Sequence, residues 1–241
     1  DFVAALAALP PMGGDWGGWA RGAHEDYLWW STPKPTPGAV RQEEVVAWLR
    51  DRLPPDAILC NGAGNFAAFL HRYHRWRRWG TQLAPTSGSM GYGFPAAVAA
   101  SIAHPGRSVV CLAGDGDFQM TLNELSTARQ FGATPVVVVM NNGQYGTIRM
   151  HQERHYPGRV SGTQMASPDF AALARAYGGH GERVERQEEF APAFERARAS
   201  GVVAVVECVL DPEALTTGQT LSEARRQGEA ALPARHGKEG P

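Results

Sequence analysis

The 241-residue chain has few cysteines, no long apolar run and almost no net charge. Its three cysteines, Cys60, Cys111 and Cys208, lie far apart within apolar stretches, so we expect buried free thiols rather than a disulfide framework. No stretch approaches the about 18 apolar residues of a membrane-spanning helix. With 23 Lys and Arg against 24 Asp and Glu, the net charge of −1 provides no general attraction to nucleic acid or to anionic membranes. These features favour a cytoplasmic protein that binds neither.

The start of the sequence also lacks expected features. Residue 1 is Asp rather than Met, and no basic segment or small-residue cleavage site of a signal peptide follows. Residues 1–6 read as the middle of an amphipathic helix, so we expect a fragment of a longer protein. What the chain has in excess is glycine and proline, 28 and 17 residues, above average usages of about 7% and 5%. This excess indicates tight turns and close approach of backbone.

Composition divides the sequence into three parts. Residues 1–40 contain four tryptophans, paired glycines and a proline-rich stretch at 33–37, which predicts the end of a preceding domain followed by a linker. Residues 41–212 are expected to form the globular domain. Residues 213–241 are polar and rich in Gly and Glu, and we expect a disordered tail there.

Apolar runs alternate with amphipathic stretches between 41 and 212. The runs predict strands at 57–60, 107–113, 135–140 and 202–210, separated by helices at 45–53, 94–103, 121–131, 170–177 and 188–199. Thr121 and Glu124 have the spacing of a capping box, and Asp169 is expected to cap the helix that follows it. Continuous apolar strands that alternate with helices predict an α/β fold, a parallel sheet with helices on both faces.

Two polar turns follow consecutive predicted strands. The first is Gly-Asp-Gly-Asp at 114–117, and the second is Asn-Asn-Gly-Gln at 141–144. Ligands of open parallel sheets bind outside the carboxyl ends of the strands, so both turns meet at one edge if the strands are neighbours. Carboxylate, amide and carbonyl oxygens suit Mg²⁺, and the glycines and a helix N-terminus after Gly116 favour a phosphate. Either turn alone is ordinary turn chemistry, but the pair points to a metal-bridged diphosphate.

Gly-Asp-Gly at 114–116, followed after 24 residues by Asn-Asn at 141–142, resembles the fingerprint of thiamine diphosphate enzymes. The sequence from about 40 to 210 resembles the C-terminal, diphosphate-binding domain of acetolactate-synthase-like enzymes. Further motifs that carry the resemblance are Gly-Ser-Met-Gly-Tyr-Gly-Phe-Pro at 88–95, Asn-Glu-Leu-Ser-Thr-Ala at 123–128, Gly-Thr-Ile-Arg at 146–149 and Pro-Asp-Phe at 168–170. The resemblance implies the thiamine diphosphate-binding fold, with thiamine diphosphate and Mg²⁺ as cofactors.

Roles at the site follow from the same resemblance. It implies that the side chains of Asp115 and Asn142 and the backbone carbonyl of Gln144 bind Mg²⁺. It implies that Met90 holds the cofactor in its bent shape, and that only the backbone N–H of Asp117 faces the diphosphate. The full set of expected cofactor contacts is Gly62, Gly64, Asn65, Gly88, Ser89, Met90, Gly114, Asp115, Gly116, Asp117, Asn142, Gln144, Tyr145, Gly146 and Thr147.

The chain departs from acetolactate synthases at two places. They carry Gln-His where this chain has Asn65-Phe66, so one polar contact to the cofactor is expected to be missing. His151 stands where they carry a Trp that selects the second 2-oxo acid, and it is either a substrate contact or a solvent-facing residue. The second departure weakens the assignment to acetolactate synthase itself and leaves a 2-oxo acid decarboxylase of the benzoylformate type as an alternative.

The resemblance implies an enzyme that decarboxylates a 2-oxo acid and then protonates the product or adds it to a second carbonyl, with the cofactor as electron sink. The activating Glu of the family lies in a pyrimidine-binding domain, normally of a partner subunit, in a homodimer or homotetramer. No such domain fits within residues 1–40, so we identify no catalytic residue here and expect the chain alone to be inactive. A non-catalytic cofactor-binding or assembly module is the third alternative.

The segment at 71–79, His-Arg-Tyr-His-Arg-Trp-Arg-Arg-Trp, is basic with interleaved aromatic residues. Such a pattern superficially suits single-stranded nucleic acid. The balanced net charge argues against that interpretation, and in the family the region lies near the subunit interface. We expect these arginines to contact a partner chain.

Overall fold

The computed structural model describes residues 1–10 and 14–236, which divide into two compact units, one up to Thr32 and one from Pro33. The first unit contains α1 (Phe2–Ala7) and α2 (Gly17–Trp30), and neither helix has a buried residue. Its four tryptophans are all exposed. The second unit carries the sheet.

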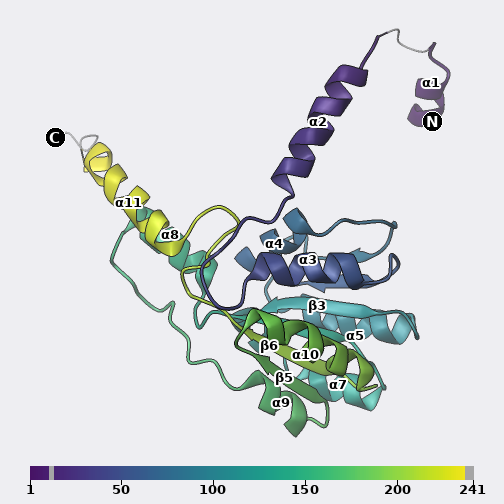
Figure 1. The fold of residues 1–241 in the computed structure, drawn as a ribbon, viewed down its shortest axis with the longest axis vertical. Coiled ribbons are helices and arrows are strands. Elements are labelled where there is room, and N and C mark those ends of the chain that lie inside the picture. Colours follow the sequence, from purple (N-terminus) through teal and green to yellow (C-terminus); the bar gives the residue numbers. More distant parts are fainter. Residues whose placement is uncertain (11–13, 237–241) are drawn as a thin grey trace. The chain divides into compact units, whose positions relative to one another are not determined.

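The second unit is built on a six-stranded, all-parallel sheet (Figure 1). The strand order is β2-β1-β3-β4-β6-β5, in which β3 and β4 occupy the centre. The strands are β1 (Ile58–Asn61), β2 (Gln82–Leu83), β3 (Val109–Gly114), β4 (Val136–Asn141), β5 (His180–Val184) and β6 (Ala204–Val209). The predicted α/β class with a parallel sheet is confirmed.

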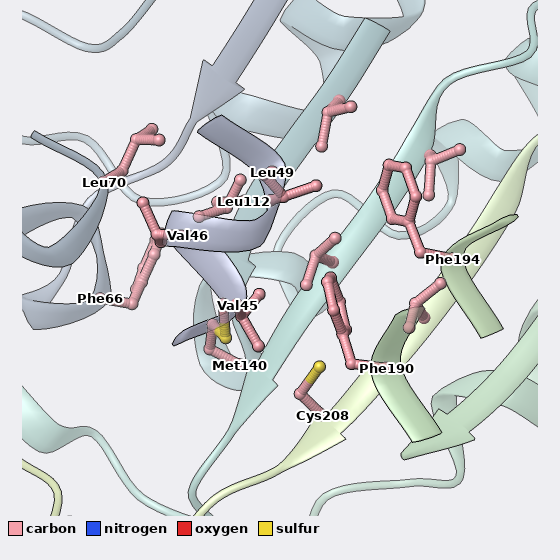
Figure 2. Close-up of a cluster of buried hydrophobic side chains, with 14 of the residues drawn as sticks. Val45, Val46, Leu49, Phe66, Leu70, Leu112, Met140, Phe190, Phe194 and Cys208 are labelled. Atoms are coloured by element: carbon pink, nitrogen blue, oxygen red, sulfur yellow. The ribbon is translucent and has the colours of Figure 1, made fainter. Parts of the chain in front are cut away.

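Helices cover both faces of this sheet because its inner strands are apolar on both sides. The helices are α3 (Gln42–Arg52), α4 (Asn65–Tyr73), α5 (Gly93–Ala103), α6 (Asp115–Gln119), α7 (Glu124–Gln130), α8 (Gly146–His155), α9 (Phe170–Ala176), α10 (Gln187–Ala199) and α11 (Leu221–His236). The side chains of α3, α4 and α10 meet one face in a first cluster, shown in Figure 2. Those of α5, α6, α7 and α9 meet the other face in a second cluster. Alternate residues of each central strand feed the two clusters.

Of the two helix caps predicted from the sequence, the structure confirms one. Asp169 caps α9 as predicted, because its carboxylate accepts a hydrogen bond from the Ala172 backbone N–H at 2.7 Å. The predicted capping box is wrong: α7 begins after Asn123, and no side chain caps it. The Thr121 hydroxyl instead donates to the carbonyl of Gly91, 3.0 Å away in a distant loop.

Both boundaries expected for the globular domain need correction. Residues 33–40 are part of the second unit: Val40 is fully buried, and Thr36 donates two hydrogen bonds to the Glu43 carboxylate, at 2.8 and 2.7 Å. Residues 213–236 do not form the expected disordered tail, since α11 occupies Leu221–His236. Leu215, Leu221 and Ala224 form a third apolar cluster with Met150 of α8, and this burial orders the segment. The rest of the expected tail, 237–241, lies outside the described residues.

All three cysteines are buried and free, as predicted. None of the helices within the described residues is long and apolar enough to cross a membrane.

Candidate functional site

The turns that follow β3 and β4 lie side by side at the carboxyl edge of the sheet. The two strands pair in parallel, with Gly114 opposite Met140, which confirms that they are neighbours. The backbone N–H of Gly143 donates to the Asp115 carboxylate, with 2.9 Å between nitrogen and Oδ2. The two turns are therefore joined by a direct hydrogen bond at the edge where parallel sheets bind ligands.

A pocket at this edge collects most of the residues that the sequence predicts as cofactor contacts. Those that line it are Gly64, Asn65, Met90, Gly114, Asp115, Gly116, Asp117, Asn142, Gln144, Tyr145, Gly146 and Thr147. The other three do not line it. Gly62 abuts the Asp117 side chain, while Gly88 and the exposed Ser89 belong to the loop that leads to Met90. Contact between any of these residues and a cofactor stays a prediction.

Other walls of the pocket were not predicted. They are formed by Gln42, Ala63, Phe66, Met140, Ile148, Leu210, Ala214 and Leu215. Leu210 comes directly after β6, so its place at the end of a buried apolar run is a signal that could have identified it. Ala214 and Leu215 fall in the segment expected to be disordered. Nothing in the sequence marks Gln42, the first residue of α3, as a pocket residue.

Asp115, the first residue of α6, is only 3% exposed. Its carboxylate accepts hydrogen bonds from the backbone N–H groups of Gly116 and Gly143, at 3.0 and 2.9 Å, and from the Ser167 hydroxyl at 3.2 Å. Burial raises the pKa of this carboxyl above its ordinary value, and these donors oppose the rise. The oxygens of Asp115 are thus held in one orientation from three sides.

The Asp117 carboxylate ties together three loops around the pocket. Its Oδ1 accepts from the backbone N–H groups of Ala63 and Gly91, at 3.2 and 2.7 Å. A Cβ on Gly62 would overlap this carboxylate, so glycine is required there for the approach. Burial raises the pKa of Asp117 to about 6, against the effect of the backbone donors. The side chain is engaged with protein N–H groups, which agrees with the expectation that only its backbone N–H faces a diphosphate.

The turn after β4 is shaped by three consecutive residues. Gly143 has a φ of +67°, a left-handed conformation that glycine adopts without strain. The Asn142 Oδ1 atom accepts from the backbone N–H of Gln144 at 3.2 Å. Gln144 Nε2 in turn donates to the carbonyl of Pro212 at 2.9 Å. Asn142 and Gln144 therefore reach the pocket that Asp115 also lines, on a turn that is fastened at both ends.

Asn65 and Phe66 occupy the place where acetolactate synthases carry Gln-His. The Asn65 backbone N–H donates to the Thr147 hydroxyl at 3.1 Å, and that hydroxyl donates to Asn65 Oδ1 at 3.0 Å. Phe66 is buried in the first cluster and packs against Gly114. The side-chain oxygen of Asn65 is thus bonded to Thr147, and Phe66 forms an apolar wall of the pocket. The loss of one polar cofactor contact at this place stays a prediction.

The donor set of the pocket fits magnesium better than a transition metal. Within residues 1–10 and 14–236, no group of three His, Cys, Asp or Glu side chains is placed to hold a metal ion. The pocket instead offers the Asp115 carboxylate, the Asn142 amide and backbone carbonyls, all hard oxygen ligands. Magnesium takes its remaining ligands from phosphate and water, so these residues fit a Mg²⁺–diphosphate cofactor.

His151 and the basic stretch at 71–79 lie outside the pocket. His151 is exposed on α8, and its ring stacks on that of His155 with 6.2 Å between centroids, which favours the solvent-facing interpretation. In the basic stretch, Arg77 donates to the carbonyls of Arg50 and Leu53 at 3.2 and 3.0 Å. Arg77 therefore contributes to the packing of α3 against the loop that follows α4.

The fold and the joined turns define a cofactor-binding domain of the thiamine diphosphate type, and comparison with known proteins bears this out. Residues 62–208 match the family described as thiamine pyrophosphate enzyme, C-terminal TPP binding domain, thiamine pyrophosphate being another name for thiamine diphosphate. This match spans more than half of the chain, and the chain belongs to that family.

Among curated proteins, its relatives include acetolactate synthases. The chain is 36% identical over 166 residues to the acetolactate synthase large subunit of Haemophilus influenzae, a match that covers 67% of this chain and 29% of that protein. It is 36% identical over 193 residues to the acetolactate synthase of Mycobacterium bovis, covering 77% of this chain and 31% of that protein. The chain thus spans about a third or less of the length of the curated relatives it matches.

Among solved structures, the chain resembles the thiamine diphosphate-dependent 4-hydroxybenzoylformate decarboxylase of Rhodococcus jostii. The TM-score is 0.70 at 28% sequence identity, and the match covers 84% of this chain and 36% of that chain. Together the comparisons confirm a thiamine diphosphate-binding domain similar to those of acetolactate-synthase-like enzymes, with a benzoylformate-type decarboxylase as a relative in structure.

Proposed function

We propose that this chain supplies the thiamine diphosphate- and Mg²⁺-binding part of an enzyme that decarboxylates a 2-oxo acid and joins the product to a second carbonyl compound. The observation that carries the proposal is the hydrogen bond between Gly143 and Asp115, which joins two fingerprint turns within one pocket. Similarity to acetolactate synthases supports the carboligation step.

In this proposal the chain's own residues bind and orient the cofactor. Asp115, Asn142 and the carbonyl of Gln144 hold Mg²⁺, and the backbone N–H groups of Gly116 and Asp117 meet the diphosphate at the start of α6. When bound, thiamine diphosphate supplies the electron sink that stabilises the carbanion left by loss of CO₂. The remaining cofactor contacts are those expected from the sequence: Gly62, Gly64, Asn65, Gly88, Ser89, Met90, Gly114, Tyr145, Gly146 and Thr147.

Met90 and Gly88 have separate proposed tasks. Met90 is half-buried in the pocket wall, as a residue that holds a bent cofactor must be. Gly88, at a φ of +68°, turns the loop that leads to it, and its carbonyl would accept a hydrogen bond from the aminopyrimidine.

The activating group belongs to a second domain in this proposal. A pyrimidine-binding domain of a partner subunit, in a cytoplasmic homodimer or homotetramer, supplies the activating Glu. The exposure of Ile148 supports a pocket that a second domain completes, because this apolar side chain lines the pocket and is still 51% exposed. We therefore expect the 241-residue chain alone to bind the cofactor weakly and to release no CO₂.

A specific observation favours a second candidate function. The similarity to a 4-hydroxybenzoylformate decarboxylase supports decarboxylation followed by protonation, without carboligation. Product analysis on the complete enzyme separates the two: acetolactate from pyruvate indicates the carboligase, and acetaldehyde indicates the decarboxylase. A non-catalytic cofactor-binding module is the third candidate, and it predicts neither product.

The first test is made on the full 241-residue chain. Equilibrium dialysis with thiamine diphosphate is expected to show binding in the presence of Mg²⁺ and none with EDTA, and a CO₂-release assay with pyruvate is expected to show no turnover. Absence of Mg²⁺-dependent binding at any concentration up to millimolar would contradict the proposed function. Turnover by the chain alone would contradict the proposed need for a second domain.

A further inference from the structure

Glu207 is a fully buried carboxylate in the interior of the sheet. It lies on β6, in register with Val139 of β4 and Arg183 of β5. The next residue, Cys208, belongs to the first cluster, as Figure 2 shows. Because side chains alternate along a strand, Glu207 points to the opposite face, where Val139 and Val205 belong to the second apolar cluster.

Stability does not account for a carboxylate at this position. Its cation is Arg183, whose Nη1 lies 2.8 Å from Oε1 but whose side chain is 42% exposed. Among the described residues, no group hydrogen-bonds to Oε2, although this atom is buried. Removing a carboxylate from water is costly, and apolar side chains of similar volume often replace buried ion pairs with no loss of stability. A buried polar group of this kind calls for another explanation.

The contacts of Oε1 lead from Glu207 to the pocket. Asn141 Nδ2 donates to Glu207 Oε1 at 2.7 Å. Because the nitrogen of the Asn141 amide faces the carboxylate, its oxygen faces the turn and accepts from the backbone N–H of Gly143 at 3.1 Å. That same N–H donates to the Asp115 carboxylate at 2.9 Å. A continuous set of hydrogen bonds thus runs from Glu207 to the bond that joins the two turns.

We propose that Glu207 is a positioning residue for the metal–diphosphate site, acting through Asn141 and Gly143. This inference rests on the proposed function. The carboxylate fixes which end of the Asn141 amide faces the turn, and so holds the Gly143 N–H between two acceptors. With an apolar residue at 207, the Asn141 amide can rotate and the turn that carries Asn142 loses one of its fastenings. Loss of such an outer partner lowers metal affinity by about 10–100-fold.

The test uses the full 241-residue chain, with Mn²⁺ as a paramagnetic substitute for Mg²⁺. Mn²⁺ is titrated in the presence of thiamine diphosphate, and free Mn²⁺ is followed by electron paramagnetic resonance. Glu207→Met is expected to weaken Mn²⁺ binding by about 10–100-fold while Tm stays the same or rises. Glu207→Gln keeps an oxygen for Asn141 and is expected to bind with nearly wild-type affinity.

Two further variants check the route and the specificity of the effect. Asn141→Ala is expected to weaken Mn²⁺ binding as much as Glu207→Met, and the double variant is expected to be no weaker than either, because both changes remove the same fastening. Glu182→Gln is the matched control. This carboxylate lies on β5 and pairs with Arg196 at 2.7 Å, away from the turns, so its loss leaves Mn²⁺ affinity unchanged.

The outcomes separate this inference from the function on which it rests. If the wild-type chain does not bind Mn²⁺ with thiamine diphosphate, the proposed function fails and the inference fails with it. If the wild type binds and Glu207→Met binds equally well, the inference alone is overturned. The inference is also overturned if the effects of Glu207→Met and Asn141→Ala on Mn²⁺ affinity are additive. It is overturned as well if Glu207→Met and Glu207→Gln both lower Tm together with Mn²⁺ affinity, because Glu207 would then act by stabilising the fold.

Discussion

His74 is a buried imidazole close to two arginines. It is 7% exposed, and its ring packs edge-on against Trp76 with 4.6 Å between centroids. Burial lowers the pKa of His74 to about 4, and the positive charges of Arg77 and Arg50 add to the effect. The folded protein therefore keeps this residue neutral at a pH where an unfolded chain has begun to protonate it.

This difference predicts a loss of stability in mild acid. The ordinary pKa of 6.5 falls to about 4 on folding, so between these values the unfolded state binds more protons, and the free energy of unfolding decreases as the pH falls. The loss amounts to about 3 kcal/mol across the interval. Urea unfolding at pH 7 and pH 4.5 measures it for the wild type and for His74→Gln, which is expected to lose less over the same range. Equal losses in both proteins would contradict this assignment.

The residues of the site differ in how far the sequence reveals them. Asp115 and Asn142 could be predicted because each follows a buried strand within a recognisable motif. The tie from the Asp117 carboxylate to Gly91 could not, because the partner is a backbone group 26 residues away. The spacing of Thr121 and Glu124 predicts a local capping box for the same reason, because spacing along the chain does not reveal a distant acceptor such as the Gly91 carbonyl.

At the scale of elements, α8, whose first three residues line the pocket, packs against α11. A Cβ on Gly228 would overlap the carbonyl oxygen of Glu153, so the two helices approach closely at that point. The fully buried Glu153 carboxylate accepts from Arg225 at 2.9 and 2.7 Å and from the backbone N–H of Gly158 at 2.9 Å. Hydrogen bonds from Arg225, from Gly158 and from Arg149 hold the pKa of Glu153 at about 2.

This ion pair is expected to control the docking of α11. Breaking a buried pair by neutralising one partner costs about 3–5 kcal/mol, and the 40% exposure of Arg225 places the expected loss for Glu153→Gln at the lower end. Hydrogen exchange of the α11 amides measures this loss of stability, and exchange is expected to be faster in Glu153→Gln than in the wild type. Glu229→Gln, an exposed change on the same helix, serves as the control. If the α11 amides of Glu153→Gln exchange as slowly as those of the wild type, the ion pair does not hold α11 in place.

Three of the elements that the sequence missed, β2, β5 and α11, are largely polar or exposed. β2 is two exposed residues and β5 is a half-exposed edge strand with polar residues, so neither has the apolar run that marks a central strand. α11 is polar enough to read as a disordered tail, and it is ordered by a few buried residues and one ion pair with α8. The central strands β3, β4 and β6 were all predicted, because burial on both faces makes them apolar throughout.

At the scale of the whole molecule, cofactor binding is expected to raise thermal stability. A ligand at about 100 times its Kd stabilises the folded state by about 2.7 kcal/mol, which corresponds to about 5–10 °C in Tm for a domain of this size. We expect this shift with thiamine diphosphate and Mg²⁺ together and not with thiamine diphosphate and EDTA. Asp115→Asn, which removes the carboxylate proposed as metal ligand, is expected to abolish it. A full shift in that variant would contradict the proposed metal site.

The class of fold could be predicted from the sequence, but the arrangement of its strands could not. Alternation of apolar runs and helices is enough to indicate a parallel sheet, whereas the order β2-β1-β3-β4-β6-β5 depends on pairings between distant segments. That β3 and β4 are neighbours follows only from the structure, in which Gly114 lies opposite Met140. The walls contributed by Gln42 and Leu215 follow only from the three-dimensional packing.

The fastening of the turn after β4 has a consequence for biosynthesis. Asn141 is held by Glu207, and Gln144 is held by Pro212, 66 and 68 residues further along the chain. When a ribosome has just released β3 and β4, both fingerprint turns have been translated but neither partner has. Nascent chains stalled before Glu207 should therefore take up no cofactor, since long-range pairing must precede a finished pocket. Loading with cofactor belongs to the last stage of folding.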